Sequence, residues 1–486
     1  MKFKIERLAV VINFLIPVAF LLSWYFFSFY SISTLCLFIL LLFNFYCRHI
    51  QKTHTLLANF GILSFLRYFL EGIGPELRQY LYSSDIEEKP FNRMERRDVY
   101  IKAKNEGESS AFGSLLDFRN RAYTLKHSLY PIEKKNLQRF SLCFGEERAL
   151  NKSYTISHPL LIGGMSYGAL GKHAVRALSR GAKKTNLIIN TGEGGYPKYH
   201  LMEACDLIFQ IGTGKFGVRK ENGDFDPDKL SSLSQKKEVK MIEIKFSQGA
   251  KPGKGGFLPK EKITEEIAKL RNIPLGKDLY SPPCHKECST PLKTVRFIQQ
   301  IQEISQLPVG IKFCLGREKE IYELFSIMKK EKSFPDYIAI DGSEGGTGAA
   351  PKTFMDDLGY DLKSSLKIID NIIKDMGINN NFKRICSGKL ISSGKQLMAM
   401  ALGSDAVSTA RGFLLALGCI QALRCHTNNC PTGITTHKTK LMKGLDIEKK
   451  SERVKNYALH ILDYNYEILG ALGLKAFSEL KPEHVM

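Results

Sequence analysis

The alternation of short apolar runs with longer helical stretches after residue 158 limits the possible folds of this chain most strongly. Strands that alternate with helices predict βαβ units and a parallel sheet. Eight such units within about 260 residues match a (β/α)8 barrel of the TIM type. The predicted strands are residues 160–162, 187–190, 207–211, 241–246, 309–313, 337–341, 384–387 and 406–409.

A doubly wound open sheet is the alternative, but no Gly-x-Gly-x-x-Gly motif follows the first strand. In a barrel, the chemistry lies where the strands end, at the C-terminal face. Glycine and polar residues follow almost every predicted strand. This pattern indicates a preformed site for an anionic ligand at that face.

Two apolar runs, residues 8–27 and 34–46, dominate the N-terminus. The first has no charge over about twenty residues, which is enough to span a bilayer. Basic residues flank both outer ends and predict a transmembrane hairpin over residues 1–52, with both ends cytoplasmic. A cleaved signal peptide is the alternative, but the run is too long and has no small-residue cleavage site. We therefore expect a cell inner-membrane protein with a cytoplasmic catalytic domain.

The remaining chain is expected to form a linker and extension (53–150), the barrel (151–445) and a C-terminal helical tail (446–486). The net charge of +21 comes from dispersed basic residues without a nucleic-acid motif. Such a balance favours a lipid surface over nucleic acid. Eleven cysteines in a chain of 486 residues do not indicate a secreted disulfide scaffold.

Two glycines after the last strands indicate a phosphate site. Gly388 follows the seventh strand, and Arg411 with Gly412 follows the eighth. Glycine there lets backbone N–H groups approach phosphate oxygens, although ordinary turn glycine is the alternative. On the fifth strand, Lys312 would direct its charge into the barrel mouth, because burying an unpaired charge is costly. That charge could stabilise a reduced flavin, or it could pair with Asp341 or Glu243.

The segment 248–256 is glycine- and lysine-rich but lacks the spacing and the Ser/Thr of a nucleotide P-loop. We interpret it as a flexible loop over the barrel mouth that carries Lys251.

Three cysteines near the C-terminus, Cys419, Cys425 and Cys430, have the spacing C-x5-C-x4-C. Thiolates this close select zinc, with His426 as a fourth ligand, or an iron–sulfur cluster. The spacing does not separate the two. A single expected helix, residues 412–424, would place the cysteines beside the barrel mouth and favours redox chemistry. A four-iron form could take its fourth ligand from Cys284, Cys288 or Cys386.

Seven motifs in this order resemble the FMN-binding domain of glutamate synthase, in its short stand-alone form. The resemblance runs from about residue 67 to residue 445 and rests on residues 165–170, 190–195, 247–253, 281–283, 341–351, 410–412 and 426–433.

The resemblance implies a barrel that holds FMN beside a [3Fe–4S] cluster. The three cysteines above would be the cluster ligands. The implied flavin-binding residues are Met165, Ser166, Gln248, Lys312, Ser343, Gly345, Gly346, Gly388, Arg411 and Gly412. The implied reaction is reductive amination of 2-oxoglutarate, through 2-iminoglutarate, to L-glutamate, within the oxidoreductases that act on CH–NH2 donors. Lys312 and Lys251 are candidates for the substrate carboxylates, and Glu193 or Glu344 for the ammonium proton.

The chain also departs from large glutamate synthases. We expect neither their N-terminal glutamine amidotransferase nor their C-terminal β-helix, so ammonia would come from solution or from a glutaminase partner. Lys254 stands where larger members carry Glu. No nicotinamide-binding motif is visible, which implies a ferredoxin or an NAD(P)H reductase subunit as electron donor. The alternatives are an FMN and iron–sulfur oxidoreductase for another 2-oxo acid, imine or quinone, and a zinc-stabilised membrane-tethered domain that is not an enzyme.

Overall fold

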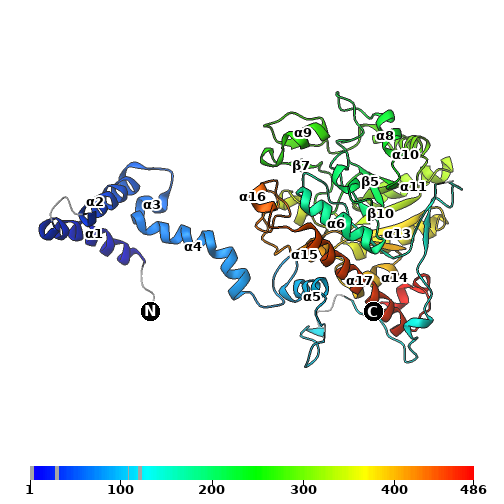
Figure 1. Cartoon of the computed structure of the whole chain (residues 1–486), viewed down its shortest axis with the longest axis horizontal. Helices are drawn as coiled ribbons and strands as arrows, with labels where there is room; N and C mark the ends of the chain where they lie inside the picture. Colours follow the sequence, from blue (N-terminus) through cyan, green and yellow to red (C-terminus); the bar gives the residue numbers. More distant parts are fainter. Residues whose placement is uncertain (1–4, 28–31, 108, 119–122, 151) are drawn as a thin grey trace. The chain divides into compact units, whose positions relative to one another are not determined.

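The computed structural model describes residues 5–27, 32–107, 109–118, 123–150 and 152–486. The chain divides into two compact units, Met1–Arg93 and Met94–Met486. Figure 1 labels many of the helices and a few of the strands.

The first unit is helical. Its first two helices, α1 and α2, pack against each other, and the hydroxyl oxygens of Ser23 and Thr34 lie 2.8 Å apart between them. Both predicted apolar runs are therefore part of helices. The elements of the unit are α1 (Ile5–Phe27), α2 (Ile32–Phe45), η1 (Tyr46–Ile50), α3 (Thr55–Phe60), η2 (Gly61–Leu63), α4 (Ser64–Leu77) and η3 (Arg78–Tyr82).

Two helical stretches among the described residues are long and apolar enough to cross a bilayer, Ile32–Ile50 and Thr55–Tyr82, and Leu15–Phe26 is a shorter apolar helix. The second stretch lies in the segment that the sequence predicts to be a linker. Length and composition are the only evidence for a membrane in this unit, and a core helix or a signal sequence passes the same test.

The second unit is built on a closed parallel barrel of eight strands, which confirms the predicted TIM-type fold. Neighbours in the barrel are also neighbours in the order of the eight strands along the chain. The strands are β3 (Leu160–Ile162), β4 (Ile189–Asn190), β5 (Leu207–Ile211), β6 (Val239–Lys245), β9 (Val309–Phe313), β10 (Tyr337–Asp341), β11 (Lys383–Ser387) and β12 (Ala406–Thr409).

Helices connect the strands, and local sequence marks their ends. In α10, for example, the Thr290 hydroxyl accepts a hydrogen bond from the Lys293 N–H (3.2 Å), and Pro291 occupies the first turn. The connecting helices are α6 (Lys172–Thr185), α7 (Lys198–Leu201), α8 (Pro227–Ser234), α10 (Pro291–Ser305), α11 (Glu318–Glu331), α12 (Lys352–Asp356), α13 (Leu362–Met376), α14 (Ser393–Ala401) and α15 (Arg411–Leu417). An insertion between β6 and α10 adds β7 (Phe257–Leu258), α9 (Glu265–Arg271) and β8 (Leu279–Tyr280).

The N-terminal end of the barrel is closed by an antiparallel hairpin, β1 (Leu142–Phe144) and β2 (Tyr154–Ile156). The Phe144 ring meets the buried Tyr337 ring edge-on at 5.5 Å. A Cβ on Gly310 would lie 2.3 Å from the Tyr337 ring, so glycine is required at that point. Apolar side chains therefore fill the barrel interior at this end.

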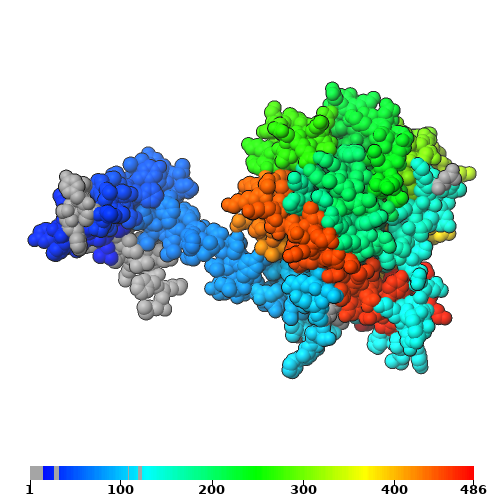
Figure 2. Space-filling model, viewed as in Figure 1, coloured from blue at the N-terminus to red at the C-terminus, as the bar shows by residue number. Residues whose placement is uncertain are grey.

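The C-terminal helix α17 (Ile447–Ala471) packs against α6, α14 and α15. Figure 2 shows these C-terminal segments, orange to red, on the surface of the barrel unit. A Cβ on Gly181 would lie 2.3 Å from Val454 Cγ1, so the two helices approach closely. The unit also includes α5 (Arg93–Lys104) and α16 (Thr439–Met442).

The helix after β12 is shorter than predicted, and the expectation of a helix over 412–424 is wrong. It ends at Leu417 because Gly418 adopts a left-handed conformation, with φ of 108°. Cys419 follows immediately, so the segment between the cysteines is a loop.

Candidate functional site

A cavity of about 210 Å³ opens at the C-terminal ends of the barrel strands. This is the face at which the sequence predicts the site. Residues from several strand ends and from the insertion after β6 line it. The predicted site residues among them are Met165, Ser166, Glu193, Gln248, Lys251, Lys312, Gly345, Gly346, Gly388, Arg411 and Cys425.

Five predicted residues do not line this cavity, namely Ser343, Glu344, Gly412, Cys419 and Cys430. The Glu344 carboxylate accepts the N–H of Leu362 at 3.1 Å, at the start of α13. Burial raises the pKa of Glu344. A Cβ on Gly412 would lie 2.4 Å from the Tyr457 hydroxyl oxygen, so this glycine serves packing against α17.

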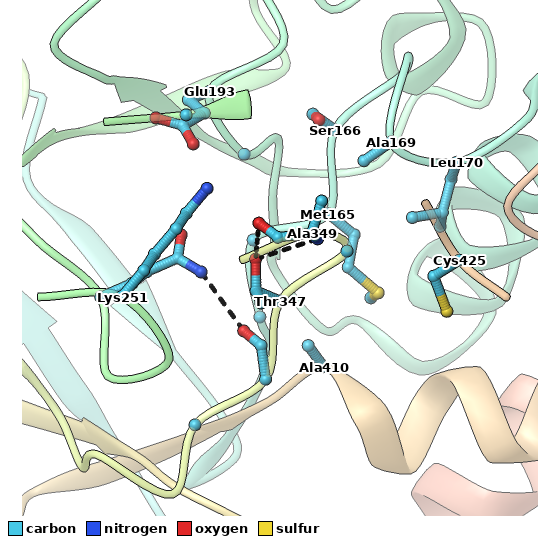
Figure 3. Close-up of a pocket in the computed structure, with 18 of the residues that line it drawn as sticks. Met165, Ser166, Ala169, Leu170, Glu193, Lys251, Thr347, Ala349, Ala410 and Cys425 are labelled. Carbon is cyan, nitrogen blue, oxygen red and sulfur yellow. Dashed lines mark hydrogen bonds between the residues drawn. The ribbon is translucent and has the colours of Figure 1, made fainter. Parts of the chain in front are cut away.

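An anion–cation group forms one wall of the cavity. Lys245 Nζ donates to Glu193 Oε1 at 2.8 Å and to Gln248 Oε1 at 2.6 Å. Burial alone would raise the pKa of Glu193, but Lys245, Lys251 and Arg271 outweigh it and hold the pKa below its usual value. Figure 3 shows the Lys251 side chain directed toward Glu193. Glu193 is therefore an ionised carboxylate among three basic side chains.

Two of these basic groups are strongly affected by burial. Burial lowers the pKa of Lys251 to about 8, although Glu193 partly opposes the change. Burial likewise lowers the pKa of Arg271 to about 10. Arg271 Nη2 donates to the Tyr167 carbonyl oxygen at 3.0 Å, whereas its buried Nε has no hydrogen-bond partner among the described residues. A wall with this surplus of cations suits an anionic ligand.

Lys312 lines the cavity and also lies 3.7 Å from Asp341 Oδ2, so the ion pair considered from sequence does form. Burial would lower the pKa of Lys312, but Asp341 and Glu243 outweigh it and raise the pKa. The other contacts of Asp341 fix its position, because its carboxylate accepts the Ser387 hydroxyl at 2.5 Å and the Gly249 N–H at 2.9 Å. Lys312 is thus a permanent cation at the cavity wall.

Another part of the cavity lining consists of glycine-rich loops beside Arg411. A Cβ on Gly346 would lie 2.7 Å from Arg411 Cδ, so the loop after β10 can approach only as glycine. Arg411 Nη2 donates to the Glu344 carbonyl oxygen at 2.5 Å. Burial lowers the pKa of Arg411 to about 10, which still leaves it charged at neutral pH. Exposed backbone and a fixed guanidinium fit a phosphate group.

The three clustered cysteines lie close enough to influence one another's pKa. Burial raises the pKa of Cys419 to about 12 and also raises that of Cys425. The pKa of Cys430 is lowered, because hydrogen bonds from Thr432 and Thr435 outweigh its burial. Figure 3 shows the Cys425 sulfur on the same side of the cavity as Met165.

No three Cys, His, Asp or Glu side chains in the described part of the chain stand close enough together to hold a single metal ion. The four-ligand zinc set of Cys419, Cys425, Cys430 and His426 is therefore not assembled. A three-iron cluster is larger than one ion, so its ligands stand farther apart. Three thiols in one loop fit the chemistry of such a cluster.

Lys262 was not predicted from sequence, yet it lies between the cavity and the cysteine loop. Its Nζ donates to the carbonyl oxygens of Ala169 and Cys425, the latter at 3.2 Å. Burial lowers its pKa to about 8. The segment that contains Lys262 and Arg271 has the charge pattern of a solvent-exposed helix. Only their burial, which the sequence does not show, distinguishes them from surface residues.

Comparisons with known proteins identify the family of the chain. A family profile described as the conserved region in glutamate synthase matches residues 91–475. The glutamate synthase large subunit-like protein YerD of Bacillus subtilis is 38% identical over 474 residues, 90% of each chain. The archaeal glutamate synthase [NADPH] of Methanocaldococcus jannaschii is 34% identical over 331 residues, which are 66% of this chain and 60% of that protein.

Among solved structures, an L230A variant of flavocytochrome b2 matches 81% of this chain and 79% of its own, at 13% identity and a TM-score of 0.48. That similarity is too low to inform function. The family profile, in contrast, covers most of the chain and includes every motif singled out from the sequence. The protein therefore belongs to the glutamate synthase family.

Proposed function

We propose that this chain is a flavin-dependent oxidoreductase that aminates 2-oxoglutarate reductively to L-glutamate. The observation that carries the proposal is the cavity wall in which Lys245, Lys251 and Arg271 surround the ionised Glu193. Carboxylates are the natural ligands of such buried cations. The relatives with glutamate synthase in their names support the same reaction class.

FMN is the cofactor that the site fits. When bound, FMN would supply hydride chemistry. The residues that would hold it are Met165, Ser166, Gln248, Lys312, the glycine loops at Gly345, Gly346 and Gly388, and Arg411. Arg411 and the glycine backbone would bind the phosphate, and Lys312 would place a positive charge at the ring. Ser343 and Gly412, which do not line the cavity, would act only by shaping these loops.

The substrate groups are assigned by charge. Lys251 would bind one carboxylate of 2-oxoglutarate, with Lys245 and Arg271 close by, and would lose this capacity when its amine becomes neutral. Glu193 would accept hydrogen bonds from ammonium, because the surrounding cations keep its carboxylate ionised. Glu344 suits that role less well, since its carboxylate accepts the Leu362 N–H and does not line the cavity.

Electrons would come from a separate donor, a ferredoxin or an NAD(P)H reductase subunit. We infer that a [3Fe–4S] cluster ligated by Cys419, Cys425 and Cys430 receives them. The position of Cys425 in the cavity wall supports this role, because it brings the cysteine loop next to the flavin site. Lys262 would hold the two together through its hydrogen bonds to Ala169 and Cys425.

We also infer that the first unit anchors the protein in the inner membrane, with the catalytic unit in the cytoplasm. The apolar helices α1 and α2 pack as a pair, and Arg48, His49 and Lys52 follow the second helix. Basic residues at that end favour the cytoplasmic side.

The test uses purified full-length protein. We expect a flavin absorption spectrum, a three-iron EPR signal after oxidation, and glutamate when the reduced protein meets 2-oxoglutarate and ammonium. A colourless, zinc-containing preparation would refute the cofactor assignment. Flavin that an artificial acceptor reoxidises while no glutamate forms would instead support an oxidoreductase for another 2-oxo acid, imine or quinone.

A further inference from the structure

The helix α4 (Ser64–Leu77) has two distinct faces. Its apolar face consists of residues spaced i, i+3, i+4, i+7 and i+11, which share one side of an α-helix. Leu66 and Phe69 are each 60% exposed and Leu70 is 50% exposed, although exposed leucine and phenylalanine are costly in water. The apolar face is Leu66, Phe69, Leu70, Ile73 and Leu77.

The charged residues of α4 mostly lie on the other side. Arg67 and Glu71 form an ion pair of 2.8 Å along that side, and both are more than half exposed. Arg78, at the start of η3, falls on the same side by helical spacing. A long helix with one exposed apolar face and one charged face is typical of a helix that lies in a membrane interface.

The beginning of α4 is attached to the end of α2. The rings of Phe43 and Phe65 stack with centroids 5.6 Å apart. The Ile62 N–H, one turn before α4, donates to Asn44 Oδ1 at 3.0 Å. Since α2 ends at Phe45 and basic residues follow, this is the level at which the proposed hairpin would leave the lipid. If the hairpin is anchored as proposed, α4 would begin at the membrane surface.

By length and mean hydropathy the stretch Thr55–Tyr82 could cross the bilayer, but the positions of its charged residues argue against a span. The uncharged part, residues 55–66, is shorter than the roughly 20 residues that a span requires. Arg67, Glu71, Glu76 and Arg78 follow within the helical stretch Thr55–Tyr82, and ionised side chains in the hydrocarbon core are costly. A third span would also put the catalytic unit on the opposite side from the basic flank of α2.

We propose that α4 lies along the cytoplasmic membrane interface, with its apolar face among the lipid headgroups and upper acyl chains. This proposal rests on the proposed membrane anchorage and adds a contact that does not cross the bilayer. The occupant of the apolar face is lipid, because α4 starts in contact with the end of the apolar helix α2 and the ion pair of Arg67 and Glu71 lies off the face.

The test places tryptophan on each side of α4. The only tryptophan of the chain is Trp24, in α1, so Trp24→Phe gives a silent background. In that background, Phe69→Trp reports on the apolar face. Tyr68→Trp is the matched control, because the Tyr68 ring packs edge-on against His54 at 6.2 Å. Both full-length variants are reconstituted in phosphatidylcholine–phosphatidylglycerol vesicles with bromine at shallow or deep acyl positions.

We expect shallow bromines to quench the Phe69→Trp variant at least threefold more than deep bromines, and the Tyr68→Trp variant to be quenched little. Stronger quenching by deep bromines would show a spanning helix and overturn the proposal. No quenching of the Phe69→Trp variant would show that protein or water covers the face, and would also overturn it. Trp24 in the wild-type protein tests the membrane anchorage separately from the position of α4. If brominated lipid fails to quench Trp24, the proposed anchorage is wrong.

Discussion

If Lys251 binds 2-oxoglutarate as proposed, the affinity for 2-oxoglutarate should fall as pH rises through 8, because Lys251 loses its charge in that range. The pKa of its amine is lowered to about 8, first by burial and further by Lys245 and Lys254, against the influence of Glu193. The cation is present below this pKa and absent above it. If only the charged form binds the substrate carboxylate, the dissociation constant should rise about tenfold between pH 7 and pH 9.

The measurement is direct binding of 2-oxoglutarate by titration calorimetry at fixed ionic strength, without ammonium or electron donor. Both carboxylates of the ligand stay ionised over this range, so the protein alone supplies the change. Lys251→Arg is the matched variant, because guanidinium remains charged up to pH 9. Its affinity should therefore change little with pH.

A dissociation constant of the wild-type protein that does not change between pH 7 and pH 9 would refute the reasoning. If the affinity of Lys251→Arg depended on pH as steeply as that of the wild-type protein, a group other than Lys251 would cause the pH dependence. Lys262 is then the candidate, since burial lowers its pKa to about 8 as well and it lines the same cavity.

Three further predictions concern the barrel and the cysteines. Arg148→Ala should lower the free energy of unfolding by about 3 kcal/mol, measured by urea denaturation, because it removes the cationic partner of the fully buried Asp336 carboxylate and leaves it neutral donors such as the Val309 N–H. Adding Asp336→Asn to this variant should restore part of the loss. Cys425→Ser should abolish the three-iron EPR signal, whereas Cys386→Ser should keep it; loss in both would point to a four-ligand cluster. Gly249→Ala should release FMN on gel filtration, because its Cβ would stand 1.7 Å from a backbone oxygen; full retention would show that the loop can move.

The barrel could be predicted because each strand is a short apolar run that ends in glycine or a polar cluster. Five of the eight strands, among them Leu160–Ile162 and Val309–Phe313, have the predicted bounds. Residues 187–188 were included in a strand that begins only at Ile189, since apolar composition does not show where ladder pairing starts.

The site was predictable where a motif marks it and not where tertiary packing makes it. Met165, Gln248 and Arg411 follow strands and do line the cavity. Lys262 and Arg271 come from an insertion whose sequence resembles a solvated surface. Glu344 belongs to a motif, yet its carboxylate accepts the Leu362 N–H at the start of α13 and does not line the cavity. Such orientations depend on contacts between distant segments, which no local pattern records.

The two hydrogen bonds of Lys262 have a consequence for electron flow. One buried ammonium group holds the backbone of the loop after β3 and the backbone at Cys425, with almost no exposure to water. Backbone carbonyl groups held in this way reorient little when the charge on a neighbouring redox group changes. If the cysteine loop holds the proposed cluster and the cavity holds the flavin, the reorganisation energy for electron transfer between them should be small, so the rate would depend mainly on distance and driving force.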